Sequence, residues 1–112
     1  MITHLVLFRP RTDLSPGARR ALMTAFEAAL RQIPSLRGAR VGRRVLTGRS
    51  YEALARVDYQ YAAVLEFDDV AGLAAYLDHP SHAQLASQFF EACEETVMYD
   101  FDLSEGTARL AV

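Results

Sequence analysis

Two segments with the alternating pattern of β-strands are apolar or small on both of their faces, and this feature most limits how the chain can fold. The first, residues 2–9, has Leu5 and Leu7 on one face and mainly apolar residues on the other. The second, residues 59–67, alternates aromatic and aliphatic side chains with small or aliphatic ones. A strand with one face in water is apolar on one face only. We therefore expect both segments in a sheet that is covered on both sides.

The remaining elements follow from helix signals and strand alternation. Ser15 is a suitable N-cap and Pro16 a suitable first residue for a helix whose apolar stripe runs to Pro34. The other predicted elements are a strand at residues 36–46, a short helix at 70–77, a second helix at 80–95 and a strand at 96–103. The order is β-α-β-β-α-β, which predicts an α+β, ferredoxin-like fold with a four-stranded antiparallel sheet.

Helices cover only one face of a four-stranded sheet of this kind. The apolar second face then needs a partner, and an isologous two-fold dimer is the commonest way to supply one. Packing the open faces of two copies together gives a dimeric α/β barrel. The sequence therefore predicts a homodimer.

Length and composition are those of a single globular domain. The chain has 112 residues, of which 51% are hydrophobic and 23% charged. We expect the domain at residues 1–103 and a C-terminal tail at 104–112. The apolar run at residues 2–8 is far too short to span a bilayer, and no basic segment precedes it. A cytoplasmic protein without a membrane partner is expected.

Charge and residue usage exclude several classes of function. All twelve basic residues are arginine, so neither a Schiff-base lysine nor a P-loop lysine is present. The net charge of -2 speaks against a nucleic acid as the main partner. Cys93 is the single cysteine, which excludes an intrachain disulfide and a thiolate metal cluster. Its place on an apolar helix face favours a core residue over a nucleophile.

Two of the three histidines lie in residues 76–82, around a proline that must interrupt any helix. Pro80 is expected to begin a new helix, so that His82 lies in its first turn, where the helix dipole favours neutral imidazole. A neutral histidine beside the Tyr76 phenol is a possible acid/base pair. The structural alternative is that His79 caps the helix, His82 is an ordinary surface residue and Tyr76 is a packing aromatic.

Two features of the second predicted strand and of the connection after it have more than one interpretation. Residues 51–58 are long for a hairpin connection and could form a helical turn that acts as a lid. Five arginines lie between positions 37 and 49. We expect these arginines to keep one face of the strand in contact with water and to lie at the rim of the dimer. The alternative is that they attract anionic ligands.

Several motifs, taken in order, resemble the stress-responsive A/B barrel, or Dabb, family of dimeric α/β barrels. The resemblance covers nearly the whole chain and rests on residues 4–8, 33–34, 41–43, 61–67, 76–82 and 99–101. The long connection at 46–58 and the tail after residue 103 depart from the family pattern.

The resemblance implies a pocket between helices and sheet. The best-understood enzymes of the family are plant polyketide cyclases, which close a poly-β-keto chain by an aldol step without a cofactor. Their catalytic histidine and tyrosine match His82 and Tyr76 here. His4 and His79 match further pocket histidines, and Tyr61 stands where the cyclase has another histidine. These three are the expected ligand-binding residues.

Three functions remain open from these considerations. The first is a homodimeric domain that binds a small aromatic or acidic molecule, without a cofactor. The second is a cofactor-independent cyclase or lyase, in which His82 is the base and Tyr76 the hydrogen-bond donor to the oxyanion. The third is an assembly module whose polar motif serves packing. Cofactor-free monooxygenases share the architecture and are a further alternative.

No metal site is expected. His79 and His82 are three residues apart, but the chain changes direction between them at Pro80, and no nearby carboxylate pair completes a ligand set.

Overall fold

Strand β1 (Ile2–Pro10) is an inner strand of a four-stranded antiparallel sheet. The computed structural model describes residues 1–111. The sheet order is β2-β3-β1-β4, with β2 at Gly38–Arg43, β3 at Tyr61–Phe67 and β4 at Cys93–Asp102. β1 pairs antiparallel with both β3 and β4, and β2 pairs antiparallel with β3. The predicted ferredoxin-like topology is confirmed.

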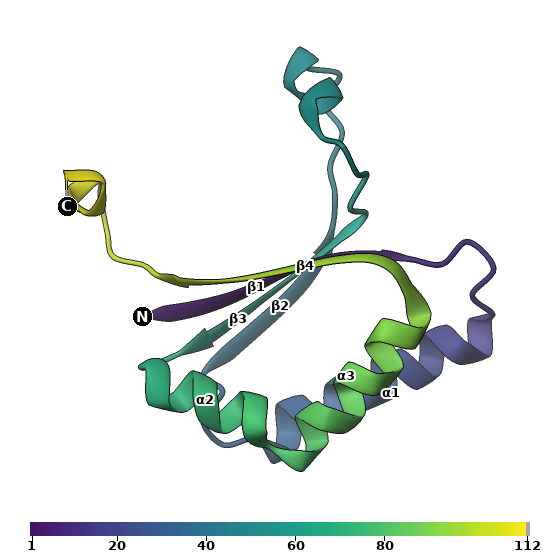
Figure 1. Ribbon diagram of the computed structural model, residues 1–112, viewed down its shortest axis with the longest axis horizontal. Coiled ribbons are helices and arrows are strands. Elements are labelled where there is room, and N and C mark those ends of the chain that lie inside the picture. The colour runs from purple at the N-terminus through teal and green to yellow at the C-terminus, as the bar shows by residue number, and fades with distance from the viewer. Residues whose placement is uncertain (112) are drawn as a thin grey trace.

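The α-helices of the described residues pack on one side of this sheet, as Figure 1 shows. They are α1 (Pro16–Gln32), α2 (Val70–Asp78) and α3 (Pro80–Ala92). The predicted start of α1 is confirmed, because the Ser15 hydroxyl accepts a hydrogen bond from the Ala18 N–H at 3.1 Å. The predicted interruption at Pro80 is also confirmed. His79 is both the C-cap of α2 and the N-cap of α3. Among the described residues, no helix has the length and apolarity needed to cross a membrane.

The core lies between the helices and the inner face of the sheet. Its largest fully buried side chains are Leu65 and Phe67 of β3. Alternate residues of β1, among them Val6 and Phe8, are buried on the same face, against Phe89 of α3 and its neighbours. The inner face is therefore a conventional apolar layer, and burial of such side chains stabilises the fold by about 1.5–3 kcal/mol each.

The outer face of the sheet carries exposed apolar side chains, and among residues 1–111 no α-helix packs on it (Figure 1). Leu5 and Leu7 of β1 point to this face and are half-buried. In the β1–β4 register Leu5 pairs with Tyr99, which is exposed, so both side chains lie on the same face. Phe101 and Val64 also belong to it. We call these five residues the open face.

The junction between α3 and β4 differs from the prediction. Helix α3 ends at Ala92 rather than at residue 95, and β4 begins at Cys93. Its ladder with β1 extends as far as the pair of Pro10 and Cys93, with a register shift after Arg9, so strand pairing overrides the helical pattern there. Cys93 is accordingly half-buried at the helix–strand junction, where it packs against the core.

The connections also differ. β2 is shorter than the predicted 36–46, and a 3-10 helix, η1 (Ser50–Leu54), forms the helical turn expected between β2 and β3. A second 3-10 helix, η2 (Ala108–Ala111), lies in the C-terminal tail.

Candidate functional site

A cavity of about 180 Å³ lies between the inner face of the sheet and the three helices. Most of its lining is apolar, and its polar side chains are those of His4, Tyr76 and His82. The apolar lining residues are Val6, Phe26, Ala63, Leu65, Leu77, Leu85, Ala86, Phe89, Phe90 and Met98. An apolar protein cavity of about 150 Å³ is large enough for benzene, so this one has room for a single ring. It is smaller than the pockets of drug-sized ligands, which start at about 300 Å³.

His82 lies in the first turn of α3, because Pro80 starts that helix immediately after α2. Its ring is centred 4.7 Å from the Tyr76 ring, at an interplanar angle of 62°. Burial lowers the pKa of His82 below its usual 6.5, and the nearby His4 lowers it further, while a hydrogen bond with the Leu77 backbone acts in the opposite direction. His82 is therefore neutral at pH 7 and able to accept a proton.

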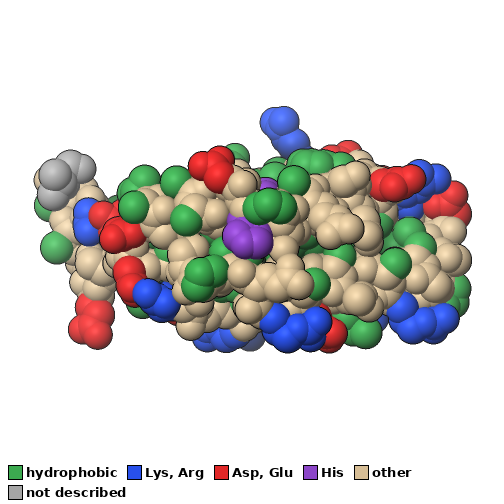
Figure 2. All heavy atoms as spheres, turned by 90° about the horizontal axis from the view of Figure 1, so that it is seen from below, with side chains coloured by type: hydrophobic (Ala, Val, Ile, Leu, Met, Phe, Trp, Pro, Cys, Tyr) green, Lys and Arg blue, Asp and Glu red, His purple; other side chains and the backbone are tan. Residues whose placement is uncertain are grey.

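Histidine side chains reach the molecular surface near the centre of the face in Figure 2. This is the face covered by helices, and hydrophobic side chains lie next to the histidines there. His79 and His82 are both partly exposed. The site is thus within reach of a molecule from solution.

Tyr76 lies in the last turn of α2 and is only 3% exposed. Its ring packs 5.3 Å from the Phe67 ring and 6.0 Å from the His4 ring, measured between centroids. Burial raises the pKa of Tyr76 to about 12. The phenol is therefore protonated at neutral pH and can donate a hydrogen bond into the cavity.

His4 projects from β1 into the same cavity and is held by a carboxylate of the neighbouring strand. Its Nδ1 lies 2.5 Å from Oδ1 of Asp100. A carboxylate only accepts hydrogen bonds, so Nδ1 of His4 carries a proton and is the donor. Asp100 is not among the site residues predicted from the sequence. The alternation of β4 indicates which face Asp100 lies on. Only the pairing of β4 with β1, and its register, shows that Asp100 lies opposite His4.

The other two predicted ligand-binding residues lie outside the cavity lining. The His79 ring caps α3, because its Nδ1 accepts a hydrogen bond from the Ser81 N–H at 3.0 Å. The Tyr61 ring stacks on Phe8 at 5.4 Å, and its hydroxyl accepts a hydrogen bond from Arg43 at 3.1 Å. The structure thus brings together His4, Tyr76 and His82, and it places His79 and Tyr61 elsewhere. A ligand-binding role for those two residues stays a prediction.

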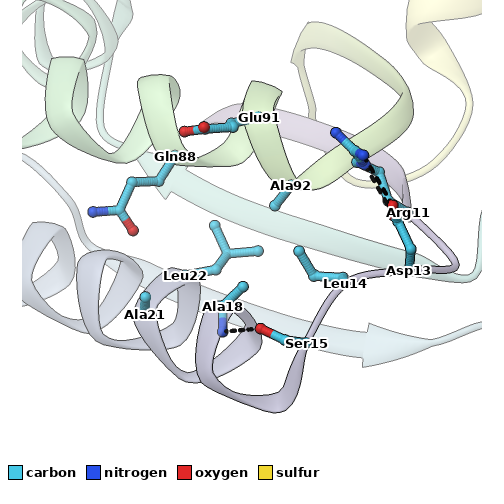
Figure 3. Close-up of a pocket in the computed structure, with 10 residues that line it drawn as sticks. All are labelled: Arg11, Asp13, Leu14, Ser15, Ala18, Ala21, Leu22, Gln88, Glu91 and Ala92. Carbon is cyan, nitrogen blue, oxygen red and sulfur yellow. Dashed lines mark hydrogen bonds and ion pairs between the residues drawn. The ribbon is translucent and has the colours of Figure 1, made fainter.

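A wider hollow of about 570 Å³ lies between the start of α1 and the end of α3 (Figure 3). Three of its polar side chains are engaged in local interactions. Arg11 pairs with Asp13 through two hydrogen bonds of 3.1 Å, which hold the pKa of the exposed Asp13 carboxyl below its usual value. Ser15 caps α1. This hollow offers no buried acid/base group, so the smaller cavity is the better candidate site.

Metal ligation has little support in the part of the chain that the structure describes. Within residues 1–111, no three His, Cys, Asp or Glu side chains lie close enough together to hold a metal ion.

Comparison with known proteins identifies the family. The model of the stress-responsive A/B barrel domain, Dabb, matches residues 2–103. A search of curated proteins found no match. Among solved structures, a protein from Arabidopsis thaliana is 17% identical, with a TM-score of 0.78 over 96% of this chain and 99% of its own.

Two further structures support the fold. A dimeric ferredoxin-like protein of unknown function from Thermobifida fusca is 27% identical, with a TM-score of 0.70 over 91% of this chain and 90% of its own. A hydroxynitrile lyase from Passiflora edulis is 20% identical, with a TM-score of 0.79 over 95% of each chain. Since the family model spans almost the entire sequence, this chain belongs to the stress-responsive A/B barrel (Dabb) domain family.

Proposed function

We propose that this Dabb protein is a homodimer that binds a small aromatic or acidic molecule in the cavity between helices and sheet. One observation carries the proposal: three polar side chains, from β1, α2 and α3, converge on a cavity whose lining is otherwise apolar. An apolar pocket with a few convergent polar groups is the usual form of a small-molecule site.

The homodimer is supported by the open face of the sheet. Tyr99 and Phe101 are large, apolar and exposed on it, next to Leu5 and Leu7. Adjacent apolar side chains of this kind mark interaction surfaces. The similar Thermobifida fusca protein is described as dimeric, which agrees with a partner on this face.

The ligand class follows from the groups in the cavity. The protonated Tyr76 phenol is a donor, whereas neutral His82 is an acceptor. A planar ring with a hydroxyl, carbonyl or carboxyl group would place its apolar part against Leu65 and Phe89 and its polar part near Tyr76 and His82.

Binding is tested by calorimetric titration of phenols, benzoates and β-keto acids into the wild type and His82→Ala. The proposal expects saturable binding to the wild type and a loss of at least about ten-fold in affinity for His82→Ala. A second pair of variants distinguishes binding in the cavity from binding at the protein surface. Ala86→Leu narrows the cavity, and Ala83→Leu adds the same atoms to an exposed position of α3.

Binding should be lost in Ala86→Leu and retained in Ala83→Leu. Binding that is unchanged in Ala86→Leu and His82→Ala would place the ligand elsewhere and refute the proposed site. No saturable binding of any of these compounds would refute the proposed ligand class.

The second candidate function is a cofactor-independent cyclase or lyase. It is favoured by the 4.7 Å separation of the His82 and Tyr76 rings, together with the lowered pKa of His82. The hydroxynitrile lyase of Passiflora edulis has a similar fold. In an aldol closure, His82 would take the proton from a carbon between two carbonyls, and that carbon would form a bond to a second carbonyl carbon.

Tyr76 would donate its hydrogen bond to the oxygen that becomes negative, and the proton held by His82 would finally neutralise it. A general base of this kind contributes about 10²- to 10⁴-fold to the rate. Turnover of a linear β-polyketo substrate, followed by product absorbance, should therefore fall at least about a hundred-fold in His82→Ala. Saturable binding without turnover would refute this second function and leave the binding protein.

A further inference from the structure

Most of the connection between β2 and β3, namely residues 45–59, projects from the body of the molecule. Figure 1 shows it rising from the sheet on the side away from the helices. We call these residues the arm. The radius of gyration, 15.4 Å, exceeds the value of about 13 Å for a compact chain of this length. We infer that the arm grips a second copy of this chain, an inference that rests on the proposed homodimer.

The tip of the arm is folded, although it stands away from the core. The Glu52 carboxylate accepts hydrogen bonds from the N–H groups of Thr47 at 2.7 Å and of Gly48 at 3.0 Å. Gly48 has φ of +78°, a conformation that glycine adopts without strain. The turn of η1 adds a bond from the Glu52 N–H to the Arg49 carbonyl at 3.1 Å. These bonds preorganise the tip for binding.

The base of the arm is tied to the sheet. Arg44, which follows β2 directly, forms an ion pair of 2.7 Å with Asp58, which lies shortly before β3. Arg9 of β1 donates to the backbone carbonyl of Asp58 at 3.1 Å. The direction of the arm is therefore set by interactions at its base and is compatible with a specific partner.

The arm exposes large apolar side chains. Val45, Leu46, Tyr51 and Leu54 are between 65% and 82% exposed. Single exposed apolar residues are ordinary, but four of them on a short, ordered projection are more than a few isolated side chains, and each would gain from burial against a partner. A partner surface can supply that burial.

The arm and the open face adjoin one another. A hollow of about 290 Å³ lies between them, lined by Val57 and Tyr59 of the arm and by Leu7 and Ala62 of the sheet. A molecule that packs on the open face therefore also meets the inner side of the arm. The proposed occupant of the open face is a second copy, so the same copy is the partner that the arm contacts. Two-fold symmetry would make the contact reciprocal.

The test is the dissociation constant of the dimer, measured by sedimentation equilibrium. Leu46→Asp/Leu54→Asp places two charges on the apolar side chains of the arm. We expect it to weaken dimerisation about a hundred-fold or more, because two leucines lose their burial. The matched control Ser50→Asp/Ala53→Asp adds the same charge to exposed small positions of the arm, and it should stay within about three-fold of the wild type.

A third variant tests whether the dimer forms through the open face, independently of the arm. Tyr99→Asp should weaken a dimer that forms through the open face. If Tyr99→Asp dissociates the dimer while Leu46→Asp/Leu54→Asp matches its control, the arm inference is overturned and the homodimer stands. If the wild type is monomeric throughout, both are overturned.

Proximity provides an independent readout. In a Cys93→Ser background, Leu54→Cys is labelled with benzophenone maleimide and irradiated. A covalent dimer is expected, whereas the same label at Met23→Cys, exposed on α1 of the helix side, should give none. Absence of a covalent dimer from Leu54→Cys in a dimeric sample would overturn the inference.

Discussion

Nδ1 of His4 and Oδ1 of Asp100 lie 2.5 Å apart, on the paired strands β1 and β4. The pair joins a buried imidazole to a half-exposed carboxylate at the edge of the cavity. It fixes a proton on Nδ1 of His4 and holds the orientation of the ring.

Replacing Asp100 by alanine should release the His4 ring. Hydrogen bonds to charged groups contribute about 1.5–3 kcal/mol, and partial exposure of Asp100 reduces this to about 1 kcal/mol of unfolding free energy. Urea unfolding measures the loss, and ¹⁵N NMR of the imidazole should show the Nδ1–H tautomer in the wild type but not in Asp100→Ala. Glu95→Ala, an exposed acidic position on the same strand, is the control. An unchanged tautomer in Asp100→Ala would contradict the assignment.

Replacing Tyr76 by phenylalanine should separate function from stability. None of the side-chain hydrogen bonds among residues 1–111 involves the Tyr76 hydroxyl, while its ring is buried in the core. Tyr76→Phe should therefore change the unfolding free energy by less than about 1 kcal/mol, and Tyr76→Ala should cost about 3–5 kcal/mol. Ligand affinity or turnover should fall in both. A large loss of stability in Tyr76→Phe would mean that the hydroxyl serves the fold.

Stability should depend on pH through His82. Because its pKa in the folded state lies below the usual 6.5, the unfolded state binds the proton more readily. The contribution of His82 is thus fully present above pH 6.5 and declines as the pH falls through the lowered pKa. Urea titrations at pH 7.5 and 5.5 should show a smaller decline for His82→Gln than for the wild type. Equal declines would show that His82 does not titrate in this range.

Cys93 should be unreactive in the native protein. Burial raises the pKa of its thiol to about 11, so very little thiolate forms at pH 8. Its reaction with Ellman's reagent should be at least about a hundred-fold slower than that of glutathione and should reach the free-thiol rate in denaturant. Fast reaction in the folded state would show that the helix–strand junction opens readily.

Much of the fold could be predicted because its signals are local. The strand alternation in residues 2–9, the N-cap Ser15 and the break at Pro80 each depend on neighbours within a few positions. The end of α3 was predicted three residues too late, because the ladder that draws Cys93 into β4 depends on Pro10, far away in the sequence.

The candidate site, too, could be predicted from the sequence only in part. The motif at residues 76–82 already places Tyr76 and His82 on either side of a helix break. It does not separate the histidine that reaches the cavity from the one that caps α3. That difference follows from the cap geometry, in which Nδ1 of His79 is occupied by the Ser81 N–H.

The sequence by itself determined the order of elements, the helix break and the presence of apolar residues on both faces of the sheet, because side-chain direction repeats every 2 residues in strands and every 3.6 in helices. Tertiary structure decided the rest. Strand register paired Asp100 with His4, helix packing formed the cavity, and the ties at Asp58 directed the arm toward the open face. These relations join residues far apart in the chain, and no local pattern specifies which partners will meet.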